Sequence, residues 1–228
     1  MTSGIFKLID ASLVQQNKFD NISHNLANSS TNGFKKSIFT FDQSLSTVTH
    51  SVTDFTTGPI VHTGNELDMA LESKGFFKIQ TVNGIRYTRD GAFTLNQDHV
   101  LVTRSGDPVL GKSGSIKLNS NDITIGVDGQ VGSGGQIIDK LSVAEFENNQ
   151  LLNKEGLSYY VYTGDESDAI VSADPNVRQR YLEKSNVEAT EEMIKMIDAF
   201  RAFESVQKAI QNLDEVTSKV VNDPVLTQ

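Results

Sequence analysis

The feature that most constrains the fold of this chain is a long amphipathic pattern near its C-terminus. From about Ser185 to Val221, apolar residues recur at helical spacings of three, four or seven positions, as on one face of a helix. They are Met193, Met196, Ile197, Phe200, Phe203, Ile210, Leu213 and Val220. At about 1.5 Å per residue, such a helix is on the order of 50 Å long. A small domain cannot cover a stripe of that length, so we expect a second long helix beside it.

The start of the chain supplies a second helical pattern. From Ser3 to about Ala27, residues Ile5, Leu8, Ile9, Ser12, Phe19, Ile22 and Leu26 recur at helical spacing. Turn-forming residues from Asn28 to Gly33 then end the pattern. We therefore expect the two terminal helices to pair as a coiled-coil-like stem. Periodicity alone leaves a plainer alternative open, in which each helix packs on the chain's own core.

Between the helices the pattern is that of β-structure. From Leu67 to about Ala173, short alternating runs are separated by hairpin signals at Asn83-Gly84, Asp90-Gly91 and Asp128-Gly129. The predicted fold class is α+β, with a central all-β domain between two long helices. The expected division is an assembly helix and turn over 1–33, an extended Ser/Thr-rich linker over 34–66, a central β domain over 67–180 and a C-terminal assembly helix over 181–228.

Composition excludes several classes of protein. The net charge is −9, from 20 basic and 29 acidic residues, which argues against nucleic-acid binding because phosphates require a basic surface. The absence of cysteine excludes a disulfide framework, a thiolate nucleophile and Cys-ligated zinc. No apolar run reaches about 18 residues, so no membrane-spanning helix is expected. Residues Met1 to Asp10 lack the basic and apolar regions of a cleaved signal peptide, so if the protein leaves the cytosol it must use a route without one.

No arrangement of residues indicates catalysis or metal binding. Histidines are scattered, and exposed or turn positions explain them best: His24, His50, His62 and His99. The run Gly132-Ser133-Gly134-Gly135 lacks the Lys-Ser/Thr of a phosphate loop, and we interpret it as a hairpin or flexible loop. Asp122 and Asp128 do not have EF-hand spacing. We expect no catalytic residue, no cofactor, no metal and no enzymatic activity.

Motifs in three regions resemble a known family, in order and over nearly the whole chain. The N-terminal motif is Ser23-His24-Asn25-Leu26-Ala27-Asn28, followed by Thr31-Asn32-Gly33-Phe34-Lys35-Lys36. The central motif is Gly75-Phe76-Phe77-Lys78-Ile79 with Tyr87-Thr88-Arg89-Asp90-Gly91-Ala92-Phe93. The C-terminal motif is Ser185-Asn186-Val187, then Glu191-Glu192-Met193 and Phe200-Arg201-Ala202-Phe203. Together they resemble the signatures of the flagellar basal-body rod and hook proteins.

This resemblance implies a structural subunit of the bacterial flagellar rod, which assembles into a helical tube and transmits torque. In that family the terminal helices line the inside of the tube, and the β domain lies outside. The implied partners are other rod and axial subunits and the flagellar type III export apparatus, with no nucleic acid and no membrane insertion. The implied location is the periplasm-spanning rod. The short chain and residues 173–178 favour the proximal over the distal rod subunit.

We expect the assembly interface to comprise Ile5, Ile9, Phe19, Ile22, Leu26, Asn28, Gly33, Phe34, Met193, Ile197, Phe200, Phe203, Ile210 and Leu213. We also expect the termini to be poorly ordered in the monomer, because isolated helices are marginally stable. Two other classes remain open from the residues themselves. One is a secreted β-rich adhesin or carbohydrate-binding module, and the other is an enzyme whose pocket the sequence does not reveal.

Overall fold

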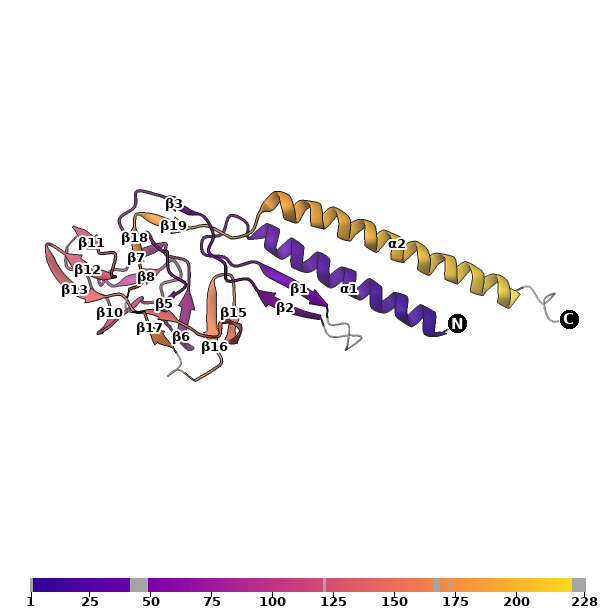
Figure 1. Ribbon diagram of the computed structural model, residues 1–228, viewed down its shortest axis with the longest axis horizontal. Coiled ribbons are helices and arrows are strands. Elements are labelled where there is room, and N and C mark those ends of the chain that lie inside the picture. Colours follow the sequence, from indigo (N-terminus) through magenta and orange to yellow (C-terminus); the bar gives the residue numbers. More distant parts are fainter. Residues whose placement is uncertain (1, 42–48, 121, 166–168, 173, 223–228) are drawn as a thin grey trace. The chain divides into compact units, whose positions relative to one another are not determined.

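The computed structural model describes residues 2–41, 49–120, 122–165, 169–172 and 174–222 (Figure 1). The chain divides into two compact units. The first, here called the helical unit, comprises Met1–Ala27, Ser37–Val52 and Glu188–Gln228. The second, here called the β body, comprises Asn28–Lys36 and Thr53–Val187. The fold is therefore α+β, with the β-rich part in the middle of the sequence.

The helical unit contains two helices that lie side by side (Figure 1). Helix α1 spans Thr2–Ala27 and helix α2 spans Ala189–Asn222, with 26 and 34 residues. Strands β1 (Ser37–Phe41) and β2 (Thr49–Thr53) form a two-stranded sheet, and β1 packs next to α1. Helix α2 carries acidic residues in its first turn and a lysine in its last, which suits the helix dipole. Asp223 and Pro224, which follow α2, lie outside the described residues.

The prediction that the terminal helices pair as a coiled-coil-like stem is wrong. A coiled coil buries its apolar seam between the helices, whereas the apolar stripes here stay largely exposed. Met193, Ile197 and Phe200 are each more than half exposed. Polar groups bridge the helices instead, as where Gln207 Nε2 donates a hydrogen bond to Ser12 Oγ over 3.4 Å. Helix α1 is also the shorter of the two and shares its surroundings with β1. Periodicity identified the apolar faces correctly but not what covers them.

The β body is built around an antiparallel six-stranded sheet with the order β15-β16-β6-β5-β14-β17. Its strands are β5 (Phe76–Thr81), β6 (Gly84–Thr88), β14 (Val143–Glu145), β15 (Leu152–Glu155), β16 (Tyr159–Tyr162) and β17 (Ile170–Val171). A 3-10 turn, η1 (Asn149–Leu151), precedes β15. A three-stranded sheet contains β11 (Ile123–Ile125), β12 (Gln130–Ser133) and β13 (Gln136–Lys140).

Four further pairs complete the β body. They are β3 (Ile60–His62) with β19 (Tyr181–Glu183), β4 (Met69–Leu71) with β18 (Val177–Gln179), β7 (Phe93–Leu95) with β8 (Leu101–Thr103), and β9 (Leu110–Gly111) with β10 (Gly114–Ser115). Strands β18 and β19 therefore return the chain to strands near its beginning, just before α2. Within the predicted linker 34–66, the structure has strands β1, β2 and β3.

Two apolar clusters form the core of the β body. The larger contains aliphatic residues and two phenylalanines: Met69, Leu71, Phe77, Ile79, Phe93, Leu101, Val109, Ile116, Leu118, Ile123, Ile125, Val131, Leu141, Val143 and Val177. The smaller is mainly aromatic, and comprises Phe76, Tyr87, Ala144, Phe146, Leu152 and Tyr160. Adjacent residues Phe76 and Phe77 belong to different clusters, because successive side chains of a strand point to opposite faces. The six-stranded sheet is therefore covered on both faces.

Two of the three predicted hairpin signals are confirmed. Asn83-Gly84 joins β5 to β6, and Asp128-Gly129 lies in the turn between β11 and β12. The Gly134-Gly135 pair turns between β12 and β13, as expected of a hairpin. Asp90-Gly91 is different, because β6 and β7 belong to separate sheets. A Cβ on Gly91 would lie 1.7 Å from the Met69 carbonyl oxygen, so this glycine permits a close approach of two backbones.

Gly33 closes the turn that follows α1 and packs directly on another backbone. Its φ is +65°, a left-handed conformation that glycine adopts without strain. A Cβ at this position would lie 2.4 Å from the backbone carbon of Arg89. Its N–H donates a hydrogen bond to the Glu183 carbonyl over 2.8 Å. The turn therefore needs glycine for its conformation and also for the space beside it.

We expect Gly33→Ala to lower the free energy of unfolding of the β body by more than about 3 kcal/mol, since strain and overlap add. Gly106→Ala is the matched control, because Gly106 also has a positive φ, +91°, but no atom within 4 Å of the added Cβ. It should cost only about 1–2 kcal/mol. Urea unfolding of both variants measures the difference, and equal losses would contradict the close packing of Gly33.

Candidate assembly site

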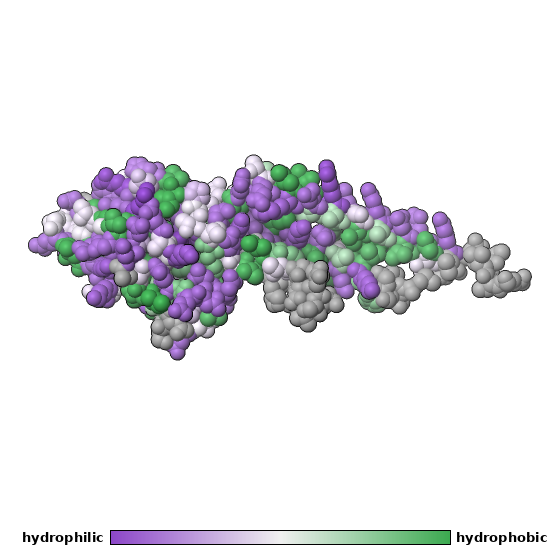
Figure 2. Space-filling view, viewed as in Figure 1, coloured by the Kyte–Doolittle hydropathy of each residue, from purple (hydrophilic) through white to green (hydrophobic). Residues whose placement is uncertain are grey.

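The helical unit has almost no core of its own. Of the 29 buried hydrophobic residues in the described part of the chain, only Ile22 and Ala199 belong to it. Of the 19 exposed large hydrophobics, 11 belong to it: Phe6, Ile9, Leu13, Phe19, Ile38, Met193, Ile194, Ile197, Phe200, Leu213 and Val216. Figure 2 shows apolar surface along the helices. A concentration of exposed apolar residues marks an interaction surface.

The predicted interface residues fall into two groups. Those on the helices are mostly exposed or half-buried: Ile9, Phe19, Leu26, Met193, Ile197, Phe200, Phe203, Ile210 and Leu213. Ile22 is buried, and the side chain of Ile5 lies outside the described part. Asn28, Gly33 and Phe34 belong to the β body and are buried there. The structure therefore gathers the helical residues on one unit and places the turn residues in the other.

A groove lies on the helical unit between the middle of α1 and the first half of α2. It is lined by Gln15, Gln16, Phe19, Asp20, Ala199, Phe200 and Phe203, and its volume is about 430 Å³. Three of these residues are aromatic, and two of the aromatic residues belong to the predicted C-terminal stripe. Such a cavity is large enough for one or two apolar side chains.

Asn25 fixes the start of β1 and the start of α2 to the end of α1. Its side chain accepts a hydrogen bond from Ser37 N–H and donates one to the Ser37 carbonyl, both over 2.9 Å. Its amide also donates to Glu192 Oε2 over 3.3 Å, and Lys195 Nζ donates to Glu192 Oε1 over 2.9 Å. Asn25 and Glu192 are both buried. These motif residues act as a polar clamp inside the helical unit.

A buried ion cluster joins three distant segments of the β body. Lys35 Nζ lies 2.5 Å from Glu183 Oε1, and Arg89 Nε lies 3.0 Å from Glu183 Oε2. The side chains of all three residues are almost completely buried. Gly58 N–H also donates to Glu183 Oε1 over 2.9 Å. One carboxylate therefore pairs with two cations that come from separate sequence motifs.

Backbone carbonyls and the Thr57 hydroxyl accept further hydrogen bonds from the two cations; Arg89 Nη2 donates to Thr57 Oγ1 over 3.2 Å. Lys35 Nζ donates to the Thr56 carbonyl over 2.7 Å, and Arg89 donates to the carbonyls of Ser73 and Gly75 over 2.7 and 2.5 Å. Burial lowers the pKa of Lys35, while the charge of Glu183 opposes that shift. Burial likewise lowers the pKa of Arg89. Glu183 and the surrounding acceptors offset part of the cost of burying these two cations.

Two further motif residues, Phe34 and Asn186, also link segments of the β body that are distant in the sequence. Phe34 is fully buried, and Lys154 Nζ lies 3.7 Å from the centre of its ring. Burial lowers the pKa of Lys154 to about 8. Asn186 Oδ1 accepts from Lys36 N–H over 2.7 Å, and its amide donates to the Asp54 carbonyl over 2.9 Å. The residues that end the N-terminal motif are thus bound to those that begin the C-terminal motif.

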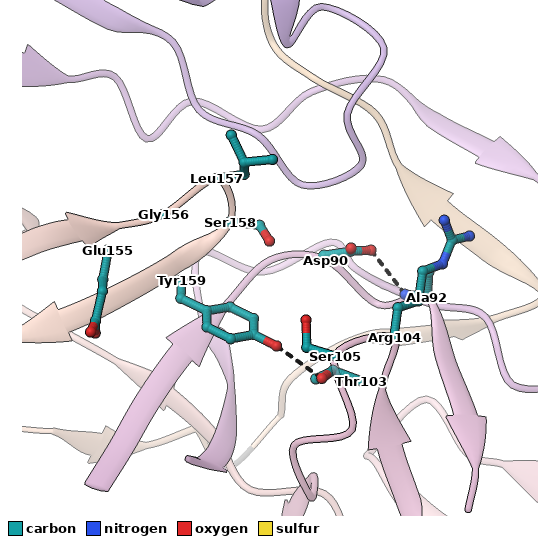
Figure 3. A pocket seen from close by; sticks show the side chains of 10 residues that line it. All are labelled: Asp90, Ala92, Thr103, Arg104, Ser105, Glu155, Gly156, Leu157, Ser158 and Tyr159. Atoms are coloured by element: carbon teal, nitrogen blue, oxygen red, sulfur yellow. Dashed lines mark hydrogen bonds between the residues drawn. The ribbon is translucent and has the colours of Figure 1, made fainter. Parts of the chain in front are cut away.

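A polar pocket on the β body tests the enzymatic alternative (Figure 3). It has a volume of about 290 Å³. Its two carboxylates have separate partners: Asp90 accepts from Ala92 N–H over 3.0 Å, and Glu155 pairs with Arg86. Tyr159 donates to Thr103 over 2.8 Å. Figure 3 shows Asp90 and Glu155 on opposite sides of the pocket. These contacts support turns and do not form an acid–base pair.

Two other predictions concern metals and membranes. Among the described residues, no group of three or more His, Cys, Asp or Glu side chains is placed to hold a metal ion. His62 packs against the Tyr181 ring, and His99 has the positive φ of a turn residue. The side chain of His50, and Asn121 beside Asp122, lie outside the described part. None of the described helices is long and apolar enough to cross a membrane.

An exposed apolar helical unit attached to a well-packed β body defines a structural subunit that assembles with other chains. Two family models match the sequence. The flagellar hook protein FlgE/F/G D1 domain matches residues 70–133, and the flagellar basal body rod FlgEFG protein C-terminal model matches residues 178–223.

Relatives match over nearly the whole length. The flagellar basal-body rod protein FlgF of Caulobacter vibrioides is 32% identical, over 97% of each chain. The flagellar basal-body rod protein FlgG is 34% identical in Buchnera aphidicola and 32% in Bacillus subtilis, over 90% and 91% of this chain and 94% and 93% of those relatives. The chain belongs to the flagellar basal-body rod protein family. It is a structural subunit of the rod, and this result replaces the adhesin alternative.

Sequence reasoning missed the structural function of several motif residues. Asn25, Lys35, Arg89 and Asn186 were visible in the motifs, and Glu183 lies two residues before the C-terminal motif, but none of the five had an assigned contact. The sequence feature that could have identified them is a charged or amide residue within or beside an apolar or turn-forming motif. Such a residue indicates a polar group that is buried and paired. Only the fold shows which residues pair.

We expect Glu183→Gln to lower the free energy of unfolding by about 3–5 kcal/mol, because Lys35 and Arg89 would lose their buried counter-ion. Glu155→Gln is the control, since its pair with Arg86 is partly exposed and should contribute less than about 1 kcal/mol. A buried lysine without its partner has a lowered pKa, so raising the pH towards that of free lysine should restore part of the loss. Urea unfolding at several pH values measures both effects. Equal, small losses would contradict the cluster.

Proposed function

We propose that the chain is a subunit of the proximal rod, and that it enters the rod through the exposed apolar faces of α1 and α2. The observation that supports the second part is how little of the helical unit is buried: among its residues whose side chains are described, Ile22 and Ala199 are the only buried hydrophobics. Burying one large apolar side chain contributes on the order of 1.5–3 kcal/mol. Several such residues at each contact, repeated along a lattice, give a stable rod from modest interfaces.

The proximal position is supported by length. The FlgF relative from Caulobacter vibrioides aligns with 97% of both chains, whereas the FlgG relatives leave about a tenth of this chain outside the alignment. The distal rod is the alternative within the family.

We further propose that neighbouring rod proteins are the partners and that the rod spans the periplasm. We also propose that subunits leave the cytoplasm through the flagellar export apparatus without a cleaved signal. The predicted sequence division at residues 33, 66 and 180 remains part of this proposal.

We expect the chain to restore motility to its own host when the gene for the proximal rod protein is deleted, and not when the gene for the distal rod protein is deleted. The reason is that each rod protein must match a different pair of neighbours. Motility on soft agar and electron microscopy of isolated basal bodies measure the outcome. Rescue of only the distal deletion would reverse the assignment.

We expect Phe200→Asp to abolish rod assembly while the β body stays folded, because a charge in an apolar interface costs several kcal/mol. Phe200 is 53% exposed, so the substitution removes little from the fold of the monomer. Val82→Asp is the matched control, since Val82 is a 99% exposed apolar residue at the β5–β6 turn. Circular dichroism should show equal melting of the β body in both variants. Working rods built from the Phe200→Asp chain would refute the proposed interface.

A further inference from the structure

Helix α1 carries a second exposed apolar feature besides its side of the groove. Phe6, Ile9 and Leu13 are 63%, 43% and 53% exposed. Their spacing of three and four residues places them on one face of the helix, as a ridge. Phe19, which lines the groove, follows Phe6 by 13 residues, or about 20 Å along a helix. Because a helix is stiff, this ridge cannot fold back into the groove of its own chain.

We propose that the Phe6–Leu13 ridge of one copy docks into the Phe19–Phe200 groove of a second copy. This inference rests on the proposed function and names the contact by which the helical faces assemble. The ridge and the groove lie at different positions along the axis of α1. Joining one to the other therefore leaves a free ridge at one end and a free groove at the other. Such head-to-tail contacts build rings or open helical arrays and do not form symmetric dimers.

Charge supports a second copy as the occupant of the groove. Asp20 lines the groove, and Glu204 follows Phe203 directly on α2. Neither forms an ion pair within the described part of the chain. The first turn of α1 has no acidic residue, so the positive end of its helix dipole is uncompensated near the ridge. Lys7 adds a positive charge beside Phe6, one turn nearer the N-terminus of the helix than Asp10.

The size of the contact indicates where it forms. An aromatic side chain buries about 150–250 Å². Three ridge residues and the groove around them therefore bury several hundred Å², which is less than the roughly 1,200 Å² of a stable complex. Two copies should consequently stay apart in dilute solution. In the rod, neighbouring contacts hold each copy in place and the same contact becomes stable.

Disulfide crosslinking tests the docking directly, because the chain has no cysteine. The variant carries Phe6→Cys and Gln16→Cys, which are ten residues and about 15 Å apart on one helix. That separation excludes a disulfide within one chain, since bridged Cα atoms lie within about 7 Å. Oxidation of assembled rods should give a ladder of covalent dimers, trimers and longer oligomers. A Phe6→Cys/Lys18→Cys variant is the control, because exposed Lys18 lies on another face of α1, and it should give no ladder.

Reversing the charges at Asp20 and Lys7 provides a second test of the docking. Asp20→Lys should reduce the ladder at least tenfold, and adding Lys7→Glu should restore it. A second pair, Ile9→Cys with Phe19→Cys, has the same ten-residue offset and repeats the test if the first variant does not assemble.

The outcomes separate this inference from the proposed function. Rods that assemble but give no ladder with either pair would overturn the docking, while the effect of Phe200→Asp on assembly would still support the helical interface. Dimers from Phe6→Cys alone would show a symmetric contact and would also overturn it. Working rods from Phe200→Asp would instead refute the proposed function itself.

Discussion

The β body depends on a single buried carboxylate. Glu183 lies between Lys35 and Arg89, so residues separated by about 50 and 90 positions meet at one point. Burying three charges is costly, and an incomplete cluster would be strongly unfavourable. The cluster therefore selects the one arrangement in which all three segments are in place. The turn at Gly33, whose N–H binds the Glu183 carbonyl, depends on the same arrangement.

The helical unit follows a different principle. It is held by polar contacts, chiefly the clamp of Asn25 on Ser37 and Glu192, and leaves its apolar residues on the surface. A self-contained helix pair would have buried Phe200 and Ile197 against α1. Leaving them exposed reduces the stability of the monomer, because their apolar area stays in contact with water. The chain thus separates a unit with a packed apolar core from a unit whose apolar residues are mostly exposed or half-buried.

Sequence reasoning succeeded where a local rule decides the structure. Asn83-Gly84 forms a hairpin because a tight turn needs a positive φ, and the runs at Phe93–Leu95 and Ile123–Ile125 are strands. It failed where the tertiary surroundings of a residue decide the local structure. Asp90-Gly91 has the composition of a hairpin turn, yet its glycine is required by the Met69 backbone, which is more than 20 residues away. The prediction of a coiled-coil-like stem failed for the same reason. An apolar stripe in the sequence shows which helix face is apolar, but not which surface packs against it.

The sequence by itself determined the helical character of both ends, the β-structure between them and, through its ordered motifs, the family. These are properties of spacing and of local backbone preference, which need no knowledge of distant residues. Only the tertiary structure decided that Glu183 pairs with both Lys35 and Arg89, that Phe34 is an interior residue, and that Phe6 and Phe200 are exposed. Burial depends on which segments meet in space, and that is set by packing over the whole chain rather than by any one stretch of it.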